Sequence, residues 1–170
     1  MNGNPAVDSR TALPIVERLH VVVRIAAERF AFSVADVDEV REMPDLECAF
    51  GATAGFIGQL RCGDRTVSAY DAAWVLGVPR EKSATDAATQ QPAQEAGALV
   101  LRCGAARVAI VVDEVEDLVM VEREWLRRVP GGADAESVLS AVYRAPRHQG
   151  GLVCIVRVPA LFAVIGEALP

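Results

Sequence analysis

The sequence predicts a mainly β protein made of two small β-barrels packed together, with only short helices. Three observations lead to this fold class. Several segments alternate in side-chain character with a period of two, which is typical of strands. The stretches with helical spacing are all short. One segment also occurs twice, which indicates two related halves.

The repeated segment covers residues 20–43 and 98–121, which align without a gap at an offset of 78 residues. This offset is longer than the roughly 20–50 residues of solenoid repeats, so it favours two related subdomains. The shared features are identical residues and a matching acid cluster: Val22 and Val100, Arg24 and Arg102, Arg29 and Arg107, Val34 and Val112, Val37 and Val115, and the acids Asp36, Asp38 and Glu39 against Glu114, Glu116 and Asp117.

Each copy begins with a predicted hairpin. In the first copy, a strand over 20–25 and a returning strand over 30–34 flank a turn at Ala27-Glu28. In the second copy, a strand from Val100 turns at 103–105 and returns over 108–112. The spacing then changes to three residues, as in Val34, Val37 and Val40. The same step recurs at Val112, Val115 and Leu118 in the second copy, and it predicts a short helical turn after each hairpin.

Further elements follow each repeat. A strand over 66–70 precedes a short helix over 71–77, with Asp71 as N-cap and Gly77 at its C-terminus. A buried strand is expected over 152–156, followed by a terminal helix over 159–165 that has Pro159 near its start. Closing each half into a barrel would remove exposed strand edges.

These elements predict four parts of the chain. Residues 1–18 form an N-terminal arm, and residues 19–79 form the first barrel, with an exchange of elements with 152–170 left open. Residues 80–97 are polar and poor in bulky apolar side chains, so we expect a flexible, dispensable loop. Residues 98–151 form the second barrel.

Composition excludes several functions. The formal net charge is −6 and the sequence pI about 5.0, which argues against nucleic-acid binding. No apolar run reaches the length of about 18 residues that predicts a membrane span, so we expect no membrane insertion. The first residues lack the pattern of a signal peptide, and we expect a cytoplasmic location.

The sequence offers no catalytic or metal-binding constellation. The four cysteines show no C-x-x-C spacing: Cys48, Cys62, Cys103 and Cys154. The acid clusters adjoin strands without a nearby nucleophile, histidine or glycine loop, so solvated faces explain them better than acid–base catalysis. We therefore expect no enzyme activity, no catalytic residue, no metal and no cofactor.

Four segments together resemble the CheW-like coupling domains of bacterial chemotaxis, over roughly residues 19–165. They are RFAFSVADVDEVREM (29–43), GFIGQLRCGDRTVSAYDAAWVLGVP (55–79), VAIVVDEVEDLVMVE (108–122) and GLVCIVRVPALF (151–162). The resemblance implies two SH3-like five-stranded barrels. It also implies a non-enzymatic adaptor that couples the tips of methyl-accepting chemoreceptors to a histidine kinase of the CheA type.

The resemblance also suggests partner-binding positions: Val34, Val37, Glu39, Val40, Arg41, Arg61, Gly63 and Arg65. The valines have a second interpretation as core residues. Gly63 stands where the family commonly has the arginine of an Asn-Leu-Arg-Gly motif, although Arg61 and Arg65 flank it. This departure leaves an alternative open, in which the chain is a CheW-like regulatory module for another signalling protein, such as a response regulator.

Overall fold

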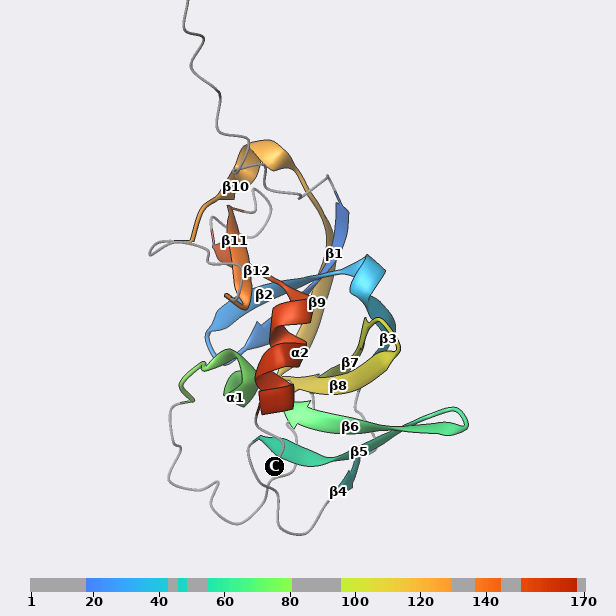
Figure 1. Ribbon diagram of the computed structural model, residues 1–170. Coiled ribbons are helices and arrows are strands. Elements are labelled where there is room, and N and C mark those ends of the chain that lie inside the picture. Colours follow the sequence, from blue (N-terminus) through green and yellow to red (C-terminus); the bar gives the residue numbers. More distant parts are fainter. Residues whose placement is uncertain are drawn as a thin grey trace, which may run out of the picture.

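The computed structural model describes residues 18–42, 46–48, 55–80, 96–129, 137–144 and 151–167. They form two six-stranded sheets with short helices between them (Figure 1), so the predicted mainly β class is confirmed. The first sheet has the order β10-β11-β12-β2-β1-β9, and the second has the order β3-β7-β8-β6-β5-β4.

The elements have the following bounds. In the first sheet they are β1 (Arg18–Ile25), β2 (Glu28–Ser33), β9 (Glu114–Val121), β10 (Leu126–Arg127), β11 (Leu139–Arg144) and β12 (Leu152–Val156). In the second sheet they are β3 (Val37–Glu42), β4 (Leu46–Cys48), β5 (Phe56–Cys62), β6 (Arg65–Asp71), β7 (Gly97–Cys103) and β8 (Ala106–Val112). The helices are α1 (Ala72–Leu76), α2 (Val158–Glu167) and the 3₁₀ turns η1 (Val34–Asp36) and η3 (Arg123–Trp125).

The two halves of the chain exchange their hairpins. We call residues 18–80 the first half and residues 96–167 the second half. The β1–β2 hairpin of the first half lies between β9 and β12 of the second, and the β7–β8 hairpin of the second half lies between β3 and β6 of the first. Both joints have the same form, with one antiparallel pair (β1 with β9, β7 with β3) and one parallel pair (β2 with β12, β8 with β6). The sequence repeat therefore encodes two sheets that each contain strands from both halves.

This exchange divides the strands differently from the ranges 19–79 and 98–151 that we expected to form separate barrels. β12, near the end of the chain, pairs with β2 of the first half. Closed five-stranded barrels are not confirmed, because each sheet has six strands and no pairing between its outer strands closes it among the described residues. One edge of each sheet ends in a very short strand, β10 or β4, which limits the ladder available for further pairing.

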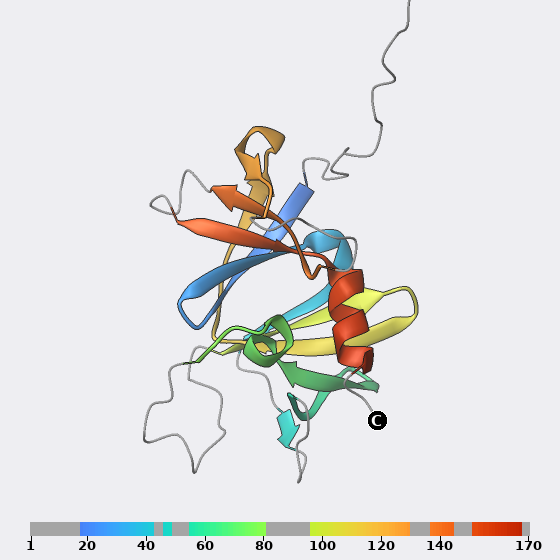
Figure 2. The ribbon, with the colours of Figure 1, turned by 60° about the vertical axis from the view of Figure 1, so that its left-hand side comes forward.

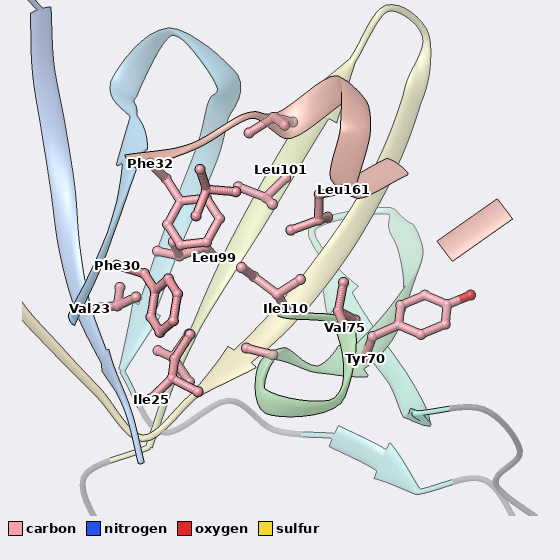
Figure 3. Close-up of a cluster of buried hydrophobic side chains, with 14 of the residues drawn as sticks. Val23, Ile25, Phe30, Phe32, Tyr70, Val75, Leu99, Leu101, Ile110 and Leu161 are labelled. Atoms are coloured by element: carbon pink, nitrogen blue, oxygen red, sulfur yellow. The ribbon is translucent and has the colours of Figure 1, made fainter. Parts of the chain in front are cut away.

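The exchanged hairpins are buried on both faces. Val21 and Val23 of β1 belong to a large core between the two sheets, which also contains Leu99 of β7. Figure 3 shows Val23 and Leu99 in this core. Val22 points the other way, into a small cluster made only of first-sheet elements. Ala98 and Val100 likewise enter a cluster within the second sheet. These strands carry apolar side chains on both faces because each face packs into its own hydrophobic cluster.

The helices cover one side of the core between the sheets (Figure 2). Helix α1 begins where predicted, because the Asp71 carboxylate accepts a hydrogen bond from the Ala73 N–H at 2.9 Å. It ends at Gly77, whose φ of 67° lies in the left-handed region that glycine adopts without strain. Leu161 of α2 is fully buried in the same core.

The predicted helical turns are wrong beyond η1, and a β-bulge is the reason. Val37 and Val40 lie in strand β3, and Val115 and Leu118 lie in β9. In a regular strand, residues three apart face opposite sides. Here the register skips Asp38 in β3 and Glu116 in β9, so that two residues oppose one in the neighbouring strand. The bulge returns the third residue to the same face and produces the three-residue spacing.

The predicted range 80–97 for the loop includes residues at both ends that belong to the folded structure. Arg80 forms ion pairs, Ala96 is buried and Gly97 begins β7. A side chain at Gly97 would place its Cβ 2.6 Å from a methyl carbon of Val115, so this residue is tightly packed. Residues 81–95 lie outside the described residues.

The ends of this segment lie close together, which leads to a prediction about its length. The guanidinium of Arg80 is 2.9 Å from the carboxylate of Asp113, which follows Val112, and Val112 is the strand partner of Gly97. We expect replacement of residues 82–94 by a six-residue Gly-Ser linker to leave the melting temperature within about 2 °C of the native value, because a short linker spans this distance. Differential scanning calorimetry would measure it. A drop of about 5 °C or more would show that the segment stabilises the fold.

Candidate functional site

Acidic residues of the repeat form ion pairs that connect the strands. Glu116, the bulged residue of β9, accepts from Arg29 Nε at 2.7 Å, and its other oxygen lies 4.0 Å from Arg24 Nε. Arg24 also donates to Glu114 at 2.7 Å, and this hydrogen bond raises the pKa of the guanidinium further above its ordinary value. These ion pairs join the β1–β2 hairpin to a strand of the other half.

The second copy repeats this arrangement in the other sheet. Asp38, the bulged residue of β3, pairs with Arg107 and lies 3.2 Å from Arg102 Nε. Arg102 and Arg107 are the repeat counterparts of Arg24 and Arg29, and Asp38 is the counterpart of Glu116. We call each group of a bulged acid and its two arginines a bulge clamp. The matching of arginines and acids in the repeat therefore reflects a reciprocal connection between the halves.

A third polar group holds the β1–β2 turn. Ala26 has a φ of 54°, which is unfavourable for a residue with a Cβ. Its N–H donates to the Asp113 carboxylate at 2.6 Å, and Arg80 bridges that carboxylate to Asp71 at 2.9 and 3.0 Å. The aspartates thus anchor the turn and α1. Like the clamps, this group offers no free acid–base pair for catalysis.

No group of three or more His, Cys, Asp or Glu side chains in the described ranges could hold a metal ion. The three cysteines whose side chains are described, Cys62, Cys103 and Cys154, are free and partly buried. Burial raises the pKa of the Cys62 and Cys154 thiols, which makes them less reactive at neutral pH.

The predicted positions on β3 divide between two faces of the second sheet. Val37 is the strand partner of Leu101 and Val40 of Leu99, so both lie on the face toward the first sheet. Val37 packs against the core, whereas Val40 is 43% exposed. Glu39 and Arg41 lie on the opposite face and form an ion pair at 2.7 Å.

The predicted positions near the β5–β6 turn are exposed. Arg61 and Arg65 project near the end of this hairpin, and Gly63 lies in the turn with a φ of 58° and no atom within 4 Å of the place where a Cβ would be. The Cys62 thiol lies close to β3: burial raises its pKa most, Glu39 raises it further and Arg41 lowers it. The structure therefore brings the end of β5 to the Glu39–Arg41 pair.

An exposed apolar surface lies at the edge of the first sheet. Leu19, Leu118 and Met120 are 39%, 56% and 53% exposed. Leu19 is the strand partner of Met120, and Leu118 is the partner of Val21, so the three side chains share the face that continues the core between the sheets. Val34, also exposed, lies in η1, which contacts β1. We call these four residues the apolar edge surface.

The sequence interpretation found only Val34 of this surface as a binding residue. Leu118 was identified as part of the three-residue step, and Leu19 and Met120 were missed. Their alternation in strands is the same as that of buried residues such as Val21 and Val23. Whether such a residue is covered depends on how the two sheets pack on each other, and sequence periodicity carries no information about that packing.

The comparisons with known proteins concern nearly the whole chain. The family model of the CheW-like domain matches residues 19–165. The crystal structure of the scaffolding protein TtCheW from Thermoanaerobacter tengcongensis is similar, with a TM-score of 0.69 at 13% sequence identity, over 91% of this chain and 94% of that one. No curated protein matches the chain. None of the described helices is long and apolar enough to cross a membrane.

The turn at Ala26 leads to a pair of opposite predictions. The repeat places Gly104, with a φ of 59°, at the position equivalent to Ala26. We expect Ala26→Gly to raise the free energy of unfolding by about 0.5–1 kcal/mol, because glycine adopts this conformation without the Cβ penalty. Gly104→Ala should lower it by a similar amount. Urea denaturation would measure both, and a loss of stability in Ala26→Gly would contradict the argument.

Proposed function

Because the chain belongs to the CheW-like domain family, we propose that it is a non-enzymatic scaffold that couples the tips of methyl-accepting chemoreceptors to a histidine kinase of the CheA type. The observation that carries the proposal is the apolar edge surface. It consists of large apolar side chains on β1, β9 and η1 that remain exposed next to the core between the sheets. Exposed apolar patches of this kind are typical of protein-binding sites.

The shape of this surface favours a helical partner. Its residues lie on β1, β9 and η1, on the part of the first sheet's core-facing side that the second sheet leaves exposed. An amphipathic helix binds such a surface by placing apolar residues from successive turns on it. The tip of a chemoreceptor, in the role that the family resemblance implies, would supply that helix. Binding at receptor tips would place the chain in the cytoplasm.

We propose β3 and the β5–β6 turn as a second contact region. Val40 is exposed on the face toward the first sheet, and the Glu39–Arg41 pair lies on the other face near Cys62. Arg61 and Arg65 add exposed positive charge to a chain of negative formal charge. The positions that the resemblance implies for partner binding all lie in this region, including Val37 and Gly63, except for Val34 in η1. A kinase domain is the partner we assign to it.

Gly63 favours one alternative. The turn offers open space where the family commonly has an arginine, so the multi-donor contact of a guanidinium is missing there. A CheW-like module with this difference could bind another signalling protein, such as a response regulator, through the same region. The two functions differ in the partner and agree on the absence of catalysis.

The apolar edge surface can be tested directly. We expect Leu118→Ser with Met120→Ser to weaken binding of a receptor-tip helical hairpin at least about ten-fold, because two exposed apolar anchors are lost. Both side chains are more than half exposed, so the fold should survive. Isothermal titration calorimetry would measure the affinity. The matched control is Leu152→Ser, which changes a 61% exposed leucine elsewhere on the first sheet. Equal binding by the double variant and the control would exclude this surface.

The role of Gly63 can be tested by restoring the arginine. We expect Gly63→Arg to increase affinity for a CheA-type kinase fragment if the standard coupling surface is otherwise present, since no atom lies within 4 Å of the place where its Cβ would be. Gly63→Ala is the control for the strain of a Cβ at positive φ. Surface plasmon resonance would compare the three proteins. Unchanged kinase binding in Gly63→Arg, together with binding to a response regulator, would favour the alternative function.

A further inference from the structure

One position of the sequence repeat has two different environments in the fold. Val34 in the first copy and Val112 in the second are repeat counterparts. Val112 is 1% exposed and belongs to the core between the sheets, where it is the strand partner of Gly97. Val34 is 38% exposed, lies in η1 and forms part of the apolar edge surface. The turn after β2 therefore differs from the turn after β8, and this difference leaves Val34 accessible to a partner.

The turn after β8 is held by a backbone hydrogen bond. The N–H of Asp113 in this turn donates to the carbonyl oxygen of Arg24 in β1 at 3.1 Å. The repeat counterpart of Asp113 is Ala35 in η1, and that of Arg24 is Arg102 in β7. The Ala35 N–H donates to the Ser33 hydroxyl at 3.3 Å, so it is used within its own segment. The turn after β2 is therefore joined to the other half in a different way.

The Arg102 side chain makes this connection. Its Nη2 donates to the carbonyl oxygen of Ala35 at 3.1 Å, and its Nε lies 3.2 Å from a carboxylate oxygen of Asp38. Asp38 also pairs with Arg107, so the bulge clamp of the second sheet orients the guanidinium. A guanidinium has several donors in a fixed plane and can bind both groups at once. Arg102 therefore links η1 to the bulge in β3.

The position of η1 depends on hydrogen bonds and not on buried side chains. None of its three residues is buried. The turn is closed by the Val37 N–H, which donates to the Val34 carbonyl oxygen. A short 3₁₀ turn has poor hydrogen-bond geometry and little stability of its own. A hydrogen bond from a charged donor is stronger than a neutral one, so the Arg102 contact is well suited to fix this turn.

We propose that Arg102 is a positioning residue for partner binding. It holds η1 so that Val34 joins Leu19, Leu118 and Met120 in one continuous apolar edge surface. This surface on the first sheet is then completed by a residue from the second sheet, and Arg102 acts through Val34 without touching the partner. The identity of the partner, a receptor-tip helix, rests on the proposed function, whereas the hold on η1 rests on the contacts of Arg102 alone.

The hold on η1 can be measured without any partner. Arg102→Met keeps an aliphatic side chain and removes the donors, and the matched control Arg24→Met removes the counterpart arginine from the other bulge clamp. We expect the Val37 N–H to exchange with solvent at least about five-fold faster in Arg102→Met, because a charge-assisted hydrogen bond that stabilises the turn is lost. The rate in Arg24→Met should remain native. Amide exchange followed by NMR would compare the three proteins.

Binding of the receptor-tip helical hairpin provides the second measurement. We expect Arg102→Met to weaken binding about five-fold and Arg24→Met to weaken it less than about two-fold, as measured by isothermal titration calorimetry at one ionic strength. In a Val34→Ala background, Arg102→Met should weaken binding by less than about two-fold, because the two residues act through one contact. A direct contact between Arg102 and the partner would give the same loss in both backgrounds.

The results separate this inference from the proposed function. Unchanged Val37 exchange in Arg102→Met would overturn the proposal, and so would equal losses of binding with and without the Val34 side chain. Native binding by Arg102→Met would also overturn it and leave the proposed function intact. If the native chain does not bind the hairpin, the proposed function fails, and the role of Arg102 in binding fails with it.

The Arg102 side chain is 46% exposed, so the fold should survive its replacement. Should Arg102→Met not fold, Arg102→Lys takes its place in the same measurements. It keeps the positive charge near Asp38 and lacks the planar fork that also reaches Ala35. The same faster exchange of the Val37 N–H and the same dependence on Val34 are expected of it, and native values for both would overturn the proposal.

Discussion

A hairpin that is apolar on both faces needs cover from two sides, and the rest of this structure follows from that need. One face of β1–β2 packs in the core between the sheets, and the other in a cluster confined to the first sheet. The β7–β8 hairpin is covered in the same way. Neither half supplies both layers for its own hairpin, and the reciprocal exchange provides them. The fold therefore depends on the presence of both copies of the repeated segment.

The bulges at Asp38 and Glu116 serve this arrangement in two ways. Each shifts the register of a strand that joins the halves, and this keeps apolar residues such as Val37 and Val115 toward the core. Each also directs an acidic side chain to the arginines of the opposite hairpin. The same local irregularity therefore aligns the packing and the charges. At partly exposed positions such as these, the ion pairs contribute more to correct matching than to stability.

The hairpins, the capped helix α1 and the mainly β class could be predicted from the sequence because they depend on local patterns. Asp71 and Gly77 are examples of signals that act within a few residues. The bulges could not be predicted, because a three-residue step has the same spacing as a helical turn, and only the neighbouring strand distinguishes the two. Short edge strands such as β4 and β10 carry too few residues for a period. The exposure of Leu19 and Met120 depends on how the two sheets pack on each other, which is a property of the whole fold.

The exchange of hairpins also sets an order for folding during synthesis. The second sheet needs nothing beyond β8, so it can form once residue 112 has emerged. The first sheet must wait for β12, since Arg29 and Ala31 of β2 are partners of Val153 and Ile155 near the end of the chain. Until then the β1–β2 hairpin lacks β12 on one side and leaves apolar surface exposed. Such long-range pairing slows folding and exposes intermediates to aggregation, and among the described hairpins β1–β2 is separated from its partner strands by the longest stretch of chain.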